Sequence, residues 1–267
     1  MINETIKGLC GFAAATVFIA NCLPAQGADP GHYVSPWKTP WTYEGMRGAD
    51  HWSALDSAYA ACNRGTAQSP IDIQHAEMAD LSPLRFANRS APLNHVSNNG
   101  HTIRVNYYAP GSGDFLTVGS IRYELLQFHF HHPSEELVRG QSYPMAAHLM
   151  YQSPSGQAAA VAVLLVAGRA NSTVQRVWDH MPIHEGQEDV SGVDLDPAGL
   201  LPSDLGYYTY EGSVTGPPCT EGVTWFVLRT PVELSAAQIA AFAVLYPNNA
   251  RPVQPLHGRI VKESSAK

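Results

Sequence analysis

Gln127-Phe128-His129-Phe130-His131 alternates polar with aromatic side chains. In a β-strand, side chains two residues apart share a face, so the two histidines point together while the two phenylalanines pack on the other side. The alternation therefore predicts a strand with one face in the core and two imidazoles on the other. Such a histidine pair is often structural or exposed, so it does not by itself establish a metal site.

A third histidine, His148, follows 17 residues after the pair, inside the apolar stretch 147–151. Residues 139–144, Arg-Gly-Gln-Ser-Tyr-Pro, are typical of a hairpin turn, so an antiparallel partner strand would bring His148 beside the pair. Three converging imidazoles suit a tetrahedral Zn²⁺ with one position left open for water. His132 falls on the opposite strand face and is not predicted to be a ligand.

The rest of the chain repeats this pattern of short strands between turns. Alternating or apolar runs of strand length lie at residues 103–107, 121–131, 147–151, 158–167 and 223–228. Two segments have helical spacing instead, and Ser172 or Thr173 is predicted to cap the first and Ser235 the second. Their apolar faces are formed by Val174, Val177, Trp178 and Met181, and by Ile239, Phe242 and Leu245. These patterns predict one mainly β domain with a few peripheral helices.

The composition is that of a globular, acidic protein. Among the 267 residues, 16 Lys+Arg stand against 23 Asp+Glu, a formal charge of −7, and 45% of residues are hydrophobic. The acid excess, without a cluster of basic residues, argues against nucleic acid or an anionic membrane as a partner. No apolar run approaches the ~18 residues that a membrane span requires, so no span is predicted.

Residues 1–27 are predicted to be a signal peptide. Lys7 precedes an apolar run at residues 9–20, and residues 25–27, Ala-Gln-Gly, offer small side chains at the usual cleavage spacing. A buried helix and a lipoprotein signal that uses Cys22 are the alternatives. The signal peptide predicts a periplasmic or secreted protein.

The chain after the predicted cleavage site begins with an arm at residues 28–40, rich in Gly, Pro, Trp and Tyr, and continues as a domain at residues 41–262. Of the four cysteines, only Cys62 and Cys219 lie in this part. Two cysteines in an exported protein most simply form one disulfide, although two buried thiols are the alternative.

Eight stretches of the chain occur in the same order in a known family. They are QSPIDI (68–73), NNGH (98–101), QFHFH (127–131), PSE (133–135), SYPMAAHL (142–149), GSVTGPPC (212–219), EGVTW (221–225) and RPVQPL (251–256). Together they resemble the α-class carbonic anhydrases, in particular the exported bacterial kind, over about residues 41–259. The resemblance implies a twisted, mostly antiparallel central sheet and a Cys62–Cys219 disulfide.

The resemblance also implies the chemistry. It assigns His129, His131 and His148 as Zn²⁺ ligands of an enzyme that hydrates CO2 reversibly to bicarbonate and a proton, by attack of zinc-bound hydroxide. Thr215 would accept a hydrogen bond from the hydroxide and donate its own proton to Glu135. An ionised carboxylate only accepts hydrogen bonds, so this pair would fix the direction of both bonds.

Release of the product proton requires a relay, for which the resemblance implies His101. Imidazole suits this role because its ordinary pKa lies close to neutral pH. His95 and His51 are weaker candidates.

The CO2 pocket implied by the resemblance is apolar and consists of Met150, Ala160, Val214 and Trp225, which also fit an ordinary core. Thr215 and Gly216 complete the predicted substrate site. Val214 stands where the family usually has Leu, and Gly216 where Thr is common. Both changes predict a wider mouth beside the attacking oxygen.

Two positions around His148 depart from the family. Position 146, usually Glu, is Ala146, and position 136, usually His, is Glu136. We hypothesise that Glu136 supplies His148 with the carboxylate that Ala146 lacks. The alternative is that water or a backbone carbonyl takes that place. Gln127 is the other residue predicted to support the ligands from behind.

Two other functions stay open at this stage. The chain could be a catalytically weak carbonic-anhydrase-like module that binds a partner, or the zinc site could have esterase side activity. The sequence has neither a nucleophile elbow nor an H-E-x-x-H motif, which argues against a dedicated hydrolase. A homodimer is possible.

Overall fold

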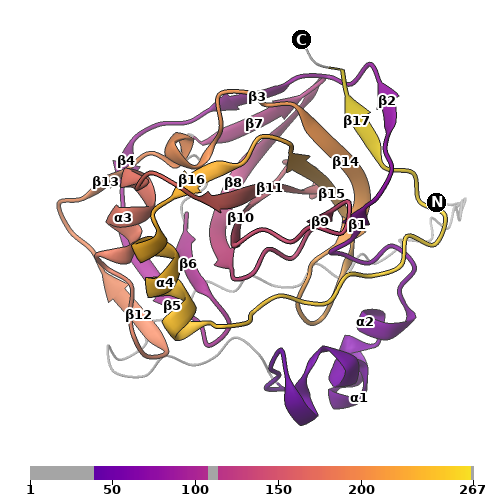
Figure 1. The fold of residues 1–267 in the computed structure, drawn as a ribbon, viewed down its shortest axis with the longest axis horizontal. Helices are drawn as coiled ribbons and strands as arrows, with labels where there is room; N and C mark the ends of the chain where they lie inside the picture. The colour runs from indigo at the N-terminus through magenta and orange to yellow at the C-terminus, as the bar shows by residue number, and fades with distance from the viewer. Residues whose placement is uncertain (1–38, 108–113, 266–267) are drawn as a thin grey trace, which may run out of the picture. The chain divides into compact units, whose positions relative to one another are not determined.

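The computed structural model describes residues 39–107 and 114–265. The predicted signal peptide (1–27) and all but the last two residues of the predicted arm (28–40) lie outside these ranges. The described residues are built around one sheet of 13 strands, drawn in Figure 1. The predicted mainly β fold with few helices is therefore confirmed.

The large sheet is mixed, with antiparallel pairs in the majority. Its main path runs β12-β5-β6-β8-β10-β11-β15-β14-β17-β2, and β3, β7 and β16 pair with members of that path or with each other. The pairs β11–β15, β11–β16 and β17–β2 are parallel, and the other pairs of this sheet are antiparallel. The bounds are β2 (Glu77–Ala79), β3 (Leu84–Ala87), β5 (His95–Asn98), β6 (Ile103–Asn106), β7 (Phe115–Val118), β8 (Ile121–His131), β10 (Met145–Gln152), β11 (Ala158–Ala167), β12 (Gly186–Asp189), β14 (Tyr207–Ser213), β15 (Glu221–Leu228), β16 (Val232–Leu234) and β17 (Lys262–Ser264).

The remaining elements are short. Two small sheets pair β1 (Asp72–Ile73) with β9 (Leu137–Val138) and β4 (Ala91–Pro92) with β13 (Asp194–Leu195). The α-helices are α1 (Trp52–Leu55), α2 (Ala61–Arg64), α3 (Ser172–Trp178) and α4 (Ala236–Leu245). The 3-10 helices are η1 (Gly45–Arg47), η2 (Ala49–His51), η3 (Ser57–Tyr59) and η4 (Pro197–Leu200).

Strand β11 separates two hydrophobic clusters, because its side chains alternate between the faces of the sheet. Val161, Val163 and Leu165 pack into the larger cluster, whereas Ala160 and Ala162 pack into a second cluster on the other face. A strand covered on both faces reads as a continuous apolar run, which is why the sequence reveals it with the observed bounds.

Strands β8 and β10 form the predicted antiparallel pair, in which His148 lies directly opposite His129. The chain reverses within the predicted turn, where Arg139 and Gly140 both have positive φ, 53° and 75°. Glycine adopts this backbone conformation without steric cost, so it favours a tight turn between these strands. The turn and the register together bring the third histidine to the pair.

Both predicted helices are present, and one cap differs from the prediction. Ser235 caps α4 with a capping box in which its side chain accepts a hydrogen bond from the backbone N–H of Gln238. Helix α3 is capped by Asn171 rather than by Ser172 or Thr173, because the Asn171 side chain accepts the Val174 N–H. Asn, Ser and Thr side chains cap the N-terminus of a helix in the same way, and the observed cap lies one residue before the first of the two predicted positions.

Cys62 in α2 and Cys219 after β14 form the predicted disulfide, which joins positions 157 residues apart. The bridge lies in a small buried cluster with Trp41, Trp52 and Tyr59. Among residues 39–107 and 114–265, no helix is both long and apolar enough to cross a membrane.

Candidate active site

Three imidazoles converge where β8 and β10 pair. One ring nitrogen from each of His129, His131 and His148 lies within 4.8 Å of the corresponding atoms of the other two. The ring centroids are 5.0 Å apart for His129 and His131, 5.4 Å for His129 and His148, and 4.5 Å for His131 and His148. His132 is outside the group, and its Nδ1 lies 2.9 Å from the backbone oxygen of Pro247.

The second nitrogen of each ring is held from behind. Nδ1 of His129 lies 2.9 Å from Oε1 of Gln127, and Nδ1 of His131 lies 2.8 Å from the backbone oxygen of Asn249. Nε2 of His148 lies 3.0 Å from Oε2 of Glu136. Because these acceptors fix a proton on the outer nitrogen, the inner nitrogen of each neutral ring presents a lone pair to the common centre.

The inner nitrogens suit a metal ion. Nε2 of His131 and Nδ1 of His148 are buried and have no hydrogen-bond partner. Burial, and then the neighbouring rings, hold the pKa of His129 and His131 well below the ordinary value. Burial also lowers the pKa of His148, but the nearby Glu136 carboxylate outweighs it and the net shift is upward. Buried nitrogen lone pairs that meet at one point are the donor set of a Zn²⁺ site.

Glu135 lies beside the inner nitrogens of His131 and His148. Its Oε1 accepts a hydrogen bond from the Arg251 backbone N–H at 2.8 Å, and its Oε2 lies 3.4 Å from Nε2 of His131. Burial raises the pKa of Glu135 to about 7, against the lowering effect of His148. The Thr215 side chain is close enough to lower this pKa further, but Oε2 has no hydrogen-bond partner. The two side chains are thus brought together.

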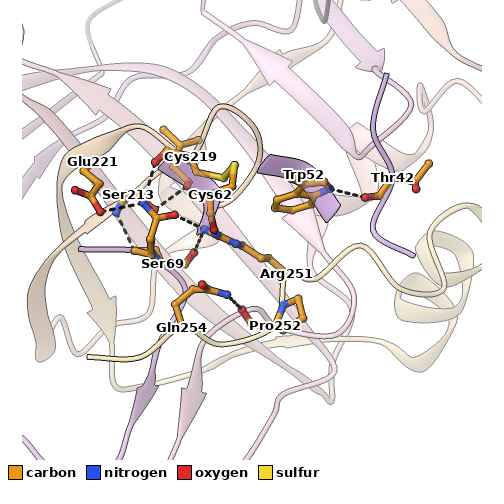
Figure 2. The surroundings of a disulfide bond; sticks show 12 residues. Thr42, Trp52, Cys62, Ser69, Ser213, Cys219, Glu221, Arg251, Pro252 and Gln254 are labelled. Carbon is orange, nitrogen blue, oxygen red and sulfur yellow. Dashed lines mark hydrogen bonds between the residues drawn. A yellow bond between two sulfur atoms is a disulfide. The ribbon is translucent and has the colours of Figure 1, made fainter. Parts of the chain in front are cut away.

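Arg251, whose backbone holds this carboxylate, extends its side chain toward the disulfide, as Figure 2 shows. Its buried guanidinium donates hydrogen bonds to the backbone oxygens of Cys62 and Ser69 and to the side chain of Gln68. Burial lowers the pKa of Arg251 to about 10, so the group is charged at neutral pH. The disulfide region therefore anchors the residue whose backbone holds Glu135.

Asn249 and Arg251 are functional neighbours that the sequence did not single out. Besides its contact with His131, Asn249 donates from Nδ2 to the backbone oxygens of His101 and Phe130. The only available signal was the RPVQPL stretch, which marks Arg251 as part of a motif without giving it a role.

Three of the residues predicted for the CO2 pocket share one row of the sheet. Met150 of β10 lies opposite Ala160 of β11, which lies opposite Trp225 of β15. Ala160 and Trp225 are buried in the second hydrophobic cluster, and the Trp225 ring lies 4.9 Å from that of His148. This row therefore belongs both to the core and to the wall of the site. Val214, the fourth residue predicted for the pocket, lies just after β14, outside the row, and is 36% exposed.

Gly216 contacts the N-terminal segment. A Cβ at this position would lie 3.2 and 3.3 Å from two ring carbons of Trp41. The absence of a side chain at Gly216 was predicted to leave a wider mouth. On the side where a Cβ would point, that space is occupied by the indole of Trp41.

His101 is outside the group of three ligands, and its ring is stacked on Trp41 with 3.6 Å between the centroids and an interplanar angle of 2°. Burial lowers the pKa of His101 to about 4. Of the weaker relay candidates, His95 pairs with Asp189 at 2.8 Å, and His51 is exposed in η2.

Comparison with known proteins is consistent with this geometry. Residues 47–265 match the profile of the family described as eukaryotic-type carbonic anhydrase. A carbonic anhydrase from Nostoc sp. is 43% identical over 229 residues, which cover 84% of this chain and 86% of that protein. One from Pectobacterium atrosepticum is 36% identical over 252 residues, covering 94% of this chain and 98% of that one.

Solved structures agree as well. The α-carbonic anhydrase of Thermovibrio ammonificans, in complex with the inhibitor sulfanilamide, has a TM-score of 0.79 and 38% identity, covering 85% of this chain and all of that one. Dioscorin complexed with ascorbate has a TM-score of 0.78 and 28% identity, covering 85% of this chain and 99% of that one.

Proposed function

The chain belongs to the eukaryotic-type, or α-class, carbonic anhydrase family, and on that premise we propose that it is a zinc enzyme that converts CO2 and water reversibly to bicarbonate and a proton. The observation that carries the proposal is the set of three imidazoles, two buried and one partly buried, whose inner nitrogens lie within 4.8 Å of one another. When bound there, zinc would lower the pKa of a water ligand from 15.7 to about 7 and supply a nucleophile at neutral pH.

Thr215 and Glu135 are proposed to orient the attacking oxygen. In its ionised form Glu135 only accepts hydrogen bonds, so the Thr215 hydroxyl would give its proton to Glu135 and accept one from the attacking oxygen. The Arg251 backbone N–H supports this role because it fixes the carboxylate. A pKa of about 7 describes Glu135 in the metal-free chain, and a nearby divalent cation favours the ionised form.

The substrate is proposed to approach along the row of Met150, Ala160 and Trp225, with Val214 and Gly216 beside Thr215. CO2 has no net dipole, so an apolar wall costs it nothing and gives charged bicarbonate no stabilisation. This arrangement would favour binding of the substrate and release of the product in the hydration direction.

The experiment that tests the function is stopped-flow CO2 hydration by the purified chain, with its zinc content measured in parallel. Activity should disappear when a chelator removes zinc and return when zinc is added back. A zinc-loaded protein without CO2 hydration activity would contradict the proposal and favour the binding-module alternative.

His101 is proposed as the proton relay. Transfer from a group of pKa about 7 directly to water is limited to roughly 10³ s⁻¹, whereas enzymes of this type approach ~10⁶ s⁻¹. In the stacked position a pKa of about 4 makes His101 a weak proton acceptor, so we expect the ring to leave Trp41 during turnover.

Replacing His101 by alanine should lower kcat at least about tenfold in weak buffer and leave kcat/KM nearly unchanged. Small imidazole-type buffers should restore part of the loss, because a dissolved imidazole can accept the product proton in place of the missing side chain. Matched His51→Ala and His95→Ala variants should behave like the parent. An unchanged kcat for His101→Ala would mean that another group carries the proton.

The domain limits and the location are also proposals. Residues 1–27 would be removed on export, leaving the arm and the domain at 41–262 in the periplasm or outside the cell. The Cys62–Cys219 disulfide supports export because disulfides persist in oxidising compartments. Intact mass of the exported protein tests the cleavage site, and light scattering tests whether it is a homodimer.

A further inference from the structure

Two adjacent carboxylates, Glu135 and Glu136, face the histidines from one segment between β8 and β9. Both are almost completely buried, with 2% and 0% of their surface exposed. Glu135 contacts the inner side of the ligand set, where its Oε2 lies 3.7 Å from Nδ1 of His148. Glu136 contacts the outer side, where its Oε2 lies 3.0 Å from Nε2 of the same ring. Glu135 thus lies near the inner nitrogen of the His148 ring, and Glu136 lies near its outer nitrogen.

Strand β10 itself offers His148 no acceptor. The side chain two residues before it, on the same face of the strand, is Ala146, which carries only a methyl group and is fully buried. Ala146 lies between His131 of β8 and Leu164 of β11. A buried imidazole N–H without an acceptor is unfavourable, so the acceptor must come from outside the strand.

We propose that Glu136 is a positioning residue that holds His148 with its proton on Nε2 and thereby sets the zinc affinity of the site. The inference rests on the proposed function, because it assumes that Nδ1 of His148 binds zinc. A carboxylate behind a ligating histidine fixes the tautomer and the ring orientation and makes the ligand more basic.

The contacts of Glu136 support a dedicated role. Its other oxygen, Oε1, is buried and has no hydrogen-bond partner, so no second group competes with His148 for the carboxylate. In the described part of the chain, Glu136 provides the hydrogen bond to Nε2 of His148, and the Trp225 ring packs against the His148 ring in a T-shaped arrangement, with 4.9 Å between the centroids. Without Glu136, that buried nitrogen would lose the acceptor that it has in this structure.

The test is zinc retention by the full mature chain in competition with a chelator. Glu136→Ala should weaken zinc binding about tenfold or more. Glu136→Gln keeps an acceptor and loses the charge, so it should show a smaller, still measurable loss. Asp114→Ala is the matched control: it removes another fully buried carboxylate, outside the ligand set, and should leave zinc retention unchanged. Ala146→Glu alone should not improve retention, because His148 already has its partner.

Two readouts separate positioning from general stability. In the zinc-loaded parent, NMR should detect a slowly exchanging imidazole N–H proton of His148, which should be lost in Glu136→Ala and kept in Glu136→Gln. Urea unfolding of the metal-free proteins should show whether Glu136→Ala and Asp114→Ala are similarly stable. Parent-like zinc retention in Glu136→Ala, equal loss in Asp114→Ala, or tighter binding in Ala146→Glu would overturn the inference. A parent that binds no zinc would instead overturn the proposed function.

Discussion

Replacing His131 by alanine is expected to lower CO2 hydration by more than about a thousandfold, together with loss of bound zinc. The His131 ring donates its inner nitrogen to the centre while Asn249 holds the outer one, so the variant removes one of three ligands. Two imidazoles cannot complete the three-histidine set that catalytic zinc sites of this kind require. The measurement is stopped-flow hydration with metal analysis of the same sample.

His132→Ala is the matched control, because it removes the adjacent imidazole, whose Nδ1 contacts the Pro247 backbone oxygen and lies outside the ligand set. This variant should keep both zinc and activity. Stoichiometric zinc with parent-like hydration in His131→Ala would exclude the assigned ligand set, as would loss of both in His132→Ala.

The second large effect is expected on stability. Replacing Cys62 and Cys219 together by serine should lower the free energy of unfolding by about 2–5 kcal/mol. The bridge closes a loop between positions 157 residues apart, and long loops lose the most conformational entropy when they are closed in the unfolded chain. Urea denaturation of the mature oxidised protein measures the difference.

The parent should contain no titratable thiol, since both cysteines of the mature chain are in the bridge. Asn63→Ser, at the exposed neighbour of Cys62, controls for substitution within α2 and should be as stable as the parent. If the double serine variant unfolds at the parent's urea concentration, the bridge does not contribute to stability.

Sequence patterns were most informative where structure repeats locally. The bounds of β8 and β11 follow from their side-chain alternation and apolar run, and the turn at Arg139 and Gly140 lies in the connection after which β10 returns beside β8, with His148 opposite His129. The cap of α3 was displaced by one residue because Asn171, Ser172 and Thr173 are all good caps in succession.

Contacts between distant segments were not predictable in the same way. Asn249 and Arg251 belong to a stretch without regular secondary structure, where no periodicity indicates which side chains turn inward. The contact of Gly216 with Trp41 joins residues far apart in the chain, and no local pattern indicates that an indole fills that space. The contact between Glu136 and His148 was predicted only because Ala146 and Glu136 both depart from the residues that the family usually has at these positions.

Asn249 and Arg251 lie far along the chain from the groups that they hold, which affects when the site can form during folding. Asn249 holds His131 across 118 positions and Arg251 holds Glu135 across 116 positions. Contacts between such distant positions form late, because the chain between them must first be closed into a loop. The surroundings of the ligand set are therefore completed after the local pairing of β8 with β10, and we expect metal loading to be one of the last events in the maturation of the protein.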